Sequence, residues 1–165
     1  MFVKYLMVSA LALSFGVVAA SADQSLSSPP TPPTPATAPA LPMTARDAVF
    51  KAADAAPAGI AGRFRVTIQA AGHQDGHVYL NTEMDYRDQR NLSVDICPEA
   101  LDGMKAKFGD NLEGAFIGKE IEVKGIAHRV KITFLADGKP TDKYYYQTHV
   151  LVCSANQVAL VSPAT

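Results

Sequence analysis

From Arg63 onward, apolar and polar residues alternate along the chain, and this period of two limits the fold more than any other feature. The apolar side of the first run is Phe64, Val66, Ile68 and Ala70. Similar runs follow at residues 77–81, 91–96, 119–134 and 144–152, with a short one at 157–161. Such alternation predicts half-buried β-strands. We therefore expect a mainly β domain over residues 62–165.

A helix is predicted between the third and fourth strands. Pro98 suits a first helical turn and Gly109 a helix end, and apolar residues repeat between them at helical spacing: Leu101, Met104 and Phe108. Three strands, one helix and then two or more strands fit a small closed barrel, and the five-stranded OB-fold is the barrel of this size and order. A sandwich and another small α+β barrel are the alternatives.

Two turns and one bend complete the expected strand pattern. Residues 72–76 end in Asp75-Gly76, and Asp137-Gly138 follows the long strand. Both pairs favour tight hairpin turns. Apolar positions in the long strand are odd-numbered before Gly125 and even-numbered after it. This change of phase predicts a β-bulge at Gly125.

Residues 1–22 have the order of a secretory signal peptide. Lys4 precedes a run from Tyr5 to Ala20 that is apolar apart from two serines, and Ala20-Ser21-Ala22 fits the small-x-small cleavage rule. An uncleaved membrane anchor is the alternative, but the run is shorter than the roughly 20 residues of a spanning helix. We expect cleavage after Ala22, no membrane span in the mature chain, and a periplasmic or secreted protein.

A proline-rich linker is predicted at residues 23–43. Seven of the chain's eleven prolines lie there, among Ser, Thr and Ala. This composition favours a disordered, polyproline-like spacer, either as a tether or as a ligand for a partner's groove. A short helix and lead-in are expected at 44–61, with Thr44 as N-cap. Its apolar face would be Val49, Phe50, Ala53 and Ala56.

Composition narrows the class of partner and of metal site. The chain has 15 Lys and Arg against 16 Asp and Glu, which excludes a wholly basic nucleic-acid coat. Its only two cysteines, Cys97 and Cys153, cannot form a four-thiolate zinc site. In an oxidising compartment they are expected to form a disulfide, and two buried thiols are the alternative.

Several motifs resemble a group of exported bacterial OB-fold proteins related to nucleic-acid-binding-like domains. The resembling segments, within residues 62–161, are Val78–Asn81, Asp85–Asp88, Asn91–Val94, Gly118–Gly125 and Tyr144–Val150. The resemblance implies an OB-fold. It brings no established activity with it, and other OB-folds bind oligonucleotides, sugars or proteins.

The candidate ligand-binding residues are aromatic, amide and basic side chains on predicted strands and loops. They are Tyr79, Asn81, Tyr86, Arg87, Arg129, Lys131, Tyr144, Tyr145 and Tyr146. The rings can stack on bases or sugars, and the cations can neutralise phosphates. Alternatively, the tyrosines fill half-exposed strand positions. Likewise, the loop 85–90 can be a salt-bridged plug that holds Tyr86 over the barrel end.

No catalytic pattern is present: the sequence has no nucleophile elbow, HExxH or phosphate loop. His73, Asp75 and His77 have metal-ligand chemistry, but Asp-Gly is also ordinary hairpin chemistry. We therefore predict no catalytic residues, metal or cofactor, and an exported, monomeric, non-enzymatic binding module.

The nominal ligand of this binding module is single-stranded nucleic acid or another extended or anionic ligand. The possible partners are an oligonucleotide, a glycan or an envelope protein. An envelope interaction or stress-related module and a metal-dependent hydrolase are the alternative functions.

Overall fold

The structure, a computed structural model, describes residues 41–162. The predicted signal peptide, its cleavage site and the linker up to residue 40 lie outside the described residues. At the predicted end of the linker, the Met43 N–H donates to the Arg63 carbonyl and the Met43 carbonyl accepts from the Arg65 N–H, both at 2.8 Å. Met43 therefore lies along the first strand of the domain.

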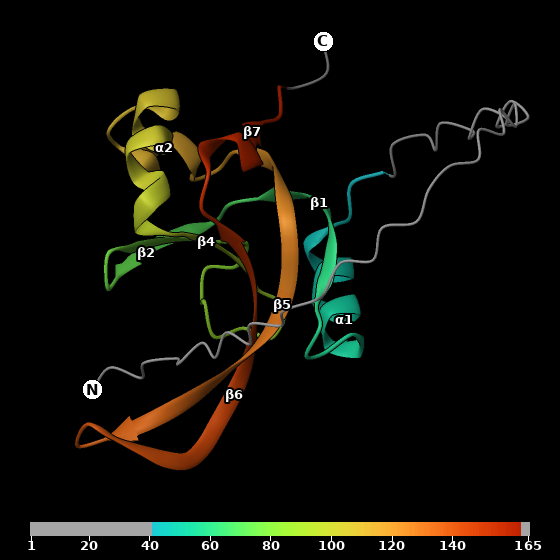
Figure 1. The fold of residues 1–165 in the computed structure, drawn as a ribbon, viewed down its shortest axis with the longest axis vertical. Coiled ribbons are helices and arrows are strands. Elements are labelled where there is room, and N and C mark those ends of the chain that lie inside the picture. Colours follow the sequence, from blue (N-terminus) through green and yellow to red (C-terminus); the bar gives the residue numbers. More distant parts are fainter. Residues whose placement is uncertain (1–40, 163–165) are drawn as a thin grey trace, which may run out of the picture. The chain divides into compact units, whose positions relative to one another are not determined.

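The described residues form one sheet of seven strands, so the expectation of a mainly β domain is confirmed (Figure 1). The strands run in the order β1-β5-β6-β4-β3-β2, and β7 pairs with β5. Pairing is antiparallel except between β4 and β6. The strands are β1 (Ile60–Thr67), β2 (Ala70–Gln74), β3 (His77–Asn81), β4 (Leu92–Ile96), β5 (Glu120–Ala136), β6 (Lys139–Val152) and β7 (Val158–Leu160).

The predicted five-stranded closed barrel is not matched, because the expected first strand is divided. β1 pairs with β5 and β2 pairs with β3, and no ladder joins β1 to β2 in the described sheet. The change of partner occurs at Ile68 and Gln69: the Ile68 N–H donates to the Lys119 carbonyl and the Gln69 N–H to the Asn81 carbonyl. The first and last strands in the sheet order, β1 and β2, are thus consecutive in the chain.

The predicted bulge at Gly125 is wrong. The register of β1 with β5 runs unbroken through the pair Gly62 and Gly125, and the irregularity in β5 lies between Thr133 and Leu135. Gly125 has another role, since a Cβ there would lie 2.7 Å from Val150 Cγ1. The missing side chain allows β6 to approach closely, two residues before the pairing of β5 with β1 stops at Ala127.

The two hairpin turns are confirmed. Asp75 and Gly76 have φ of 52° and 82°, and Asp137 and Gly138 have φ of 51° and 73°. Positive φ at both central residues is what a type I′ hairpin turn requires. The first turn is shorter than predicted, because β2 extends to Gln74.

The helical insert follows β4 as predicted. It comprises η1 (Pro98–Ala100), α2 (Leu101–Phe108) and α3 (Leu112–Phe116). Met104 of α2 is fully buried, and the rings of Phe108 and Phe116 meet edge to face at 4.9 Å. These side chains join a core formed by the inward residues of the strands, among them Phe64, Leu80, Leu92, Ile96 and Ile121.

α1 (Ala45–Asp54) begins as predicted but buries a different face. Thr44 caps it: the Thr44 Oγ1 accepts from the Asp47 N–H at 3.2 Å, and the Asp47 carboxylate accepts from the Thr44 N–H at 3.3 Å. Its buried residues are Ala48 and Ala52, whereas Phe50 is 60% exposed. The small alanines allow close packing on the sheet, so the larger apolar side chains point elsewhere. None of the helices in residues 41–162 is long and apolar enough to cross a membrane.

Cys97 and Cys153 form a disulfide in the structure, with their Cα atoms 5.2 Å apart. Cys97 directly follows β4 and Cys153 directly follows β6, and these strands are parallel neighbours. The disulfide therefore links two adjacent strand ends across 56 residues of sequence.

Reducing this disulfide should lower the free energy of unfolding by about 4 kcal/mol, because the unfolded chain regains the freedom of a long loop. Chemical denaturation with and without reductant measures the loss, and Cys97→Ala/Cys153→Ala is the matched variant. Two free thiols by mass spectrometry in non-reduced protein from its native source would contradict the disulfide.

Candidate functional site

The β5–β6 ribbon presents different chemistry on its two sides. Side chains of directly opposed residues share a face of a sheet. Lys131 lies opposite Tyr146, whereas Ile132 lies opposite Tyr145. Because neighbouring residues along a strand alternate between faces, the tyrosine run 144–146 is divided between the two sides.

The side that carries Tyr145 continues across β6, β4 and β3 as a surface that we call the polar face. It is formed by Tyr79, Asn81, Ser93, Tyr145, Gln147 and His149, together with Tyr86 of the loop 82–91. Val78 and Leu80 are buried in the core, which leaves their neighbours on β3 to point outward, as predicted for Tyr79. The polar face surrounds a cavity of about 600 Å³.

The lining of this cavity has no fixed charge among the described residues. Aromatic, amide, hydroxyl and imidazole groups line it, together with small and apolar residues, and no Asp, Glu, Lys or Arg does. Asp95, directly opposite Tyr79, is not part of the lining; its carboxylate meets His77 Nδ1 at 2.6 Å and lies 3.7 Å from His149 Nδ1. Burial raises the pKa of Tyr79, with the Asp95 charge adding to the effect, so its hydroxyl stays protonated. The polar face thus offers neutral hydrogen-bonding groups and ring surfaces.

Asn91 holds the loop of the polar face in place. This fully buried side chain accepts at Oδ1 from the backbone N–H groups of Thr82 (2.9 Å) and Glu83 (3.1 Å). Its Nδ2 donates to Asn81 Oδ1 at 3.0 Å and to Ser93 Oγ at 2.9 Å. One side chain therefore fixes both ends of the loop to the sheet. In addition, this network orients Asn81.

Gln147 and His149 extend the network to Tyr145 and the loop. Gln147 Nε2 donates to the Tyr145 hydroxyl at 2.9 Å and to the Tyr86 carbonyl at 3.3 Å, and Gln147 Oε1 meets His149 Nε2 at 2.6 Å. The His149 ring meets that of Tyr79 edge to face at 6.0 Å. Burial lowers the pKa of His149, although nearby Asp95 opposes the shift.

The loop 85–90 is bound together by its own ion pairs. Arg90 pairs with Asp88 at 2.7 Å, and its hydrogen bonds lower the Asp88 pKa to about 2. Arg87 lies 4.3 Å from the centroid of the Tyr86 ring, which is 43% exposed. The Tyr86 ring is therefore half exposed, while its backbone carbonyl accepts hydrogen bonds from Gln147 Nε2 at 3.3 Å and from Asn91 Nδ2 at 3.4 Å.

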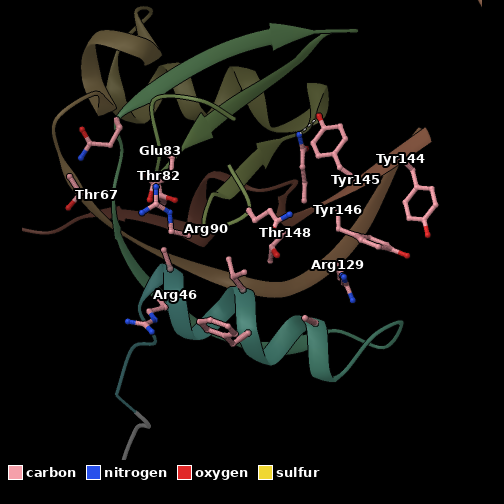
Figure 2. Close-up of a pocket in the computed structure, with 17 residues that line it drawn as sticks. Arg46, Thr67, Thr82, Glu83, Arg90, Arg129, Tyr144, Tyr145, Tyr146 and Thr148 are labelled. Carbon is pink, nitrogen blue, oxygen red and sulfur yellow. Dashed lines mark hydrogen bonds between the residues drawn. The ribbon is translucent and has the colours of Figure 1, made fainter. Parts of the chain in front are cut away.

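The other side of the ribbon forms a second candidate site, which we call the arginine cleft (Figure 2). It lies between α1, the loop 82–90 and β6, and it contains Arg129, Tyr144 and Tyr146. Lys131 lies beside it, with Nζ 4.1 Å from the centroid of the Tyr144 ring. Tyr145 also borders this cleft, since it lies at the boundary between the two sites.

The nine residues predicted as one ligand-binding set are thus placed at two sites. Tyr79, Asn81, Tyr86 and Tyr145 line the polar face; Arg129, Tyr144, Tyr145 and Tyr146 line the arginine cleft; Arg87 and Lys131 stack against rings at the margins. Sequence reasoning missed Ser93, Gln147 and His149. Their alternation with the buried residues of β4 and β6 was the available signal, because outward polar positions follow from the same period of two.

The two histidines of residues 72–77 have different carboxylate partners in the structure. His73 meets Glu113 at 2.7 Å and His77 meets Asp95. Within residues 41–162, one group of His, Cys, Asp or Glu is compact enough for a metal, Cys97, Glu99 and Cys153, and its two sulfurs are bonded to each other.

The sequence matches no protein-family model and no curated protein, and it has a distant likeness to a solved structure. Among solved structures, the chain is similar to aspartyl tRNA synthetase from Entamoeba histolytica, with 15% identity over 68% of this chain and a TM-score of 0.38. The match spans 21% of that enzyme's length. A likeness this low carries no conclusion about fold or function.

Replacing Asn91 with Ala should lower the free energy of unfolding by about 2–3 kcal/mol, because two loop N–H groups and two buried side chains lose partners. Thermal or chemical denaturation measures this. Gln89→Ala, in the same loop but exposed, is the control and should change stability by less than about 0.5 kcal/mol. Equal effects of the two variants would contradict the anchoring role.

The His149 imidazole should titrate below its usual pKa of 6.5. The unfolded chain then takes up a proton near pH 6.5 while the folded protein does not, so His149 makes the protein lose stability as the pH falls through that value. NMR titration measures the pKa. Denaturation over pH should show a shallower decline in His149→Asn, and an identical decline would contradict the assignment.

Proposed function

We propose that this protein is an exported, non-enzymatic binding module of the OB-fold type that holds an extended polymer across the polar face. The fold assignment is supported by connectivity. If β1 and β2 count as one bent strand, β3 and β4 continue it as a meander, the helical insert follows β4, and β6 returns parallel to β4. OB-folds are Greek-key barrels of five strands that bind ligands across one face of the sheet.

The ligand class that the polar face fits best is a neutral, polyhydroxylated chain, that is, a glycan segment. The observation that carries this proposal is the lining itself, which combines several rings with amides and hydroxyls and contains no fixed charge. Rings pack against the apolar faces of sugars, and neutral donors and acceptors pair with hydroxyl groups. Asn81 suits this role because its Oδ1 is held by Asn91 and Ser93, which orients the Nδ2 donor.

Single-stranded nucleic acid, the nominal ligand from the sequence, suits the polar face less well. Its backbone needs cations, and these supply most of the affinity of non-specific binding. No Arg or Lys lines the polar face, and Arg87, beside Tyr86 of that face, stacks on the Tyr86 ring and lies 3.8 Å from Asp85.

Tyr79→Ala should weaken binding of a neutral oligosaccharide by about tenfold, because the central ring of the face is lost while its neighbours remain. Calorimetry with cello- and chito-oligosaccharides, and with an oligothymidylate for comparison, measures this. Tyr79→Phe keeps the ring and should bind nearly as the parent protein does.

Melting temperature controls for folding. The absence of saturable binding by any of these oligosaccharides, or equal affinity of folded Tyr79→Ala, would overturn the proposal. Tight oligothymidylate binding that Tyr79→Ala abolishes would instead assign the polar face to nucleic acid.

A further inference from the structure

The arginine cleft is the larger of the two candidate sites, and its chemistry is opposite to that of the polar face. Its volume is about 1030 Å³, and its walls come from α1, the loop 82–90 and the β5–β6 ribbon. Ligand pockets commonly have volumes of about 300–1,000 Å³. In Figure 2, Arg46 projects from α1 at one end, and Arg129 lies near Tyr146 at the other.

Three guanidinium groups from distant parts of the sequence line this cleft: Arg46, Arg90 and Arg129. Asp88 neutralises Arg90. Within residues 41–162, neither Arg46 nor Arg129 has an ion pair with a carboxylate, and the only acidic residue in the lining is Glu83. Two guanidiniums are therefore available to an anion, and their planar donors suit phosphate oxygens.

Aromatic rings lie beside these cations. The Arg129 guanidinium is 3.8 Å from the centroid of the Tyr146 ring, and Tyr144 meets Tyr146 edge to face at 5.6 Å. Arg46 lies 5.6 Å from the centroid of the Phe50 ring. Phe50 is 60%, Tyr144 49% and Tyr146 37% exposed, so none of the three serves mainly as core. Each end of the cleft thus pairs a cation with an exposed ring.

A ligand that satisfies both features must carry an anion and a flat ring. A bare anion would use the guanidiniums but leave the rings exposed to water, and a neutral sugar would leave the guanidiniums unpaired. A phosphate joined to a nucleobase uses both, because guanidiniums pair with phosphate and aromatic rings stack on bases.

We propose that the arginine cleft is a second ligand site, separate from the polar face, and that it binds a nucleotide unit. Arg129 holds the phosphate of a unit whose base stacks on Tyr146 and Tyr144, and Arg46, at the opposite end of the cleft, pairs with a second phosphate where the ligand is a strand. A free mononucleotide and one unit of a single strand share this chemistry, so the test includes both.

Fluorescence anisotropy with a labelled oligothymidylate of about 12 nucleotides, competed with unlabelled thymidine monophosphate, tests the proposal on the purified protein. If two phosphates are neutralised, affinity should fall about sevenfold between about 50 and 200 mM salt. Arg46→Ala and Arg129→Ala should each weaken binding and halve the salt dependence. Tyr146→Ala should cost about tenfold in affinity, and Tyr146→Phe should cost little.

Two control variants separate this site from its surroundings. Arg65→Ala removes an exposed arginine outside the cleft and should leave binding unchanged. Tyr79→Ala should also leave it unchanged, so failure of this proposal and failure of the glycan proposal are distinguishable. Both Tyr146 variants are compared at equal folded fraction by melting temperature.

Three results would overturn the proposal. The first is the absence of saturable binding of either nucleotide probe. The second is that inorganic polyphosphate competes as strongly as oligothymidylate and that Tyr146→Ala leaves the affinity unchanged. Together these two results would leave only a general anion site. The third is that Tyr79→Ala loses nucleotide binding while Arg129→Ala keeps it, which would assign the nucleotide to the polar face. Binding of the mononucleotide or the oligomer with the expected variant pattern supports it.

Discussion

The antiparallel pairing of β5 with β6 is the interaction on which the rest of the structure depends. β5 also pairs with β1 and β7, and β6 also pairs with β4, so this one ladder joins the two halves of the sheet. It continues beyond Ala127, where the pairing of β5 with β1 stops, to the turn at Asp137-Gly138. Both candidate sites are built on this continuation, one on each side.

Strand alternation then separates two kinds of chemistry over a short distance. Tyr145 stands between Tyr144 and Tyr146 in the chain, yet its ring is not part of their edge-to-face pair. Its hydroxyl instead accepts a hydrogen bond from Gln147 Nε2. On its side the cavity lining has no fixed charge, and its amide, hydroxyl and imidazole groups are hydrogen-bonded to one another. On the opposite side the guanidiniums and rings are exposed. A hydrogen-bonded network in a low-dielectric setting is rigid, which suits recognition by shape, whereas exposed cations attract ligands over longer distances and respond to salt.

Much of the fold follows from local rules that act over a few residues. The alternation at Phe64 and Val66, the Asp-Gly turns and the Thr44 cap depend on backbone geometry and on near neighbours, and these appear as expected. The division of the first strand at Ile68 does not, because it requires the carbonyl of Lys119 on one side and that of Asn81 on the other. At Gly125, the sequence indicates an unusual backbone position, but only the approach of Val150 explains it.

At the polar face, the sequence by itself determined that Tyr79 points away from the core, since it must oppose Val78 and Leu80 on a pleated strand. The sequence also supplies the two cysteines of the disulfide. The parallel pairing of β4 with β6 brings them together. Only the tertiary structure decided that one predicted set of nine residues serves two surfaces, and that Arg46 and Phe50 of α1 belong to one of them. The physical reason is that α1 packs on the sheet through the small buried side chains of Ala48 and Ala52. The face that this leaves outward is decided by contacts between residues far apart in the chain, which no local pattern records.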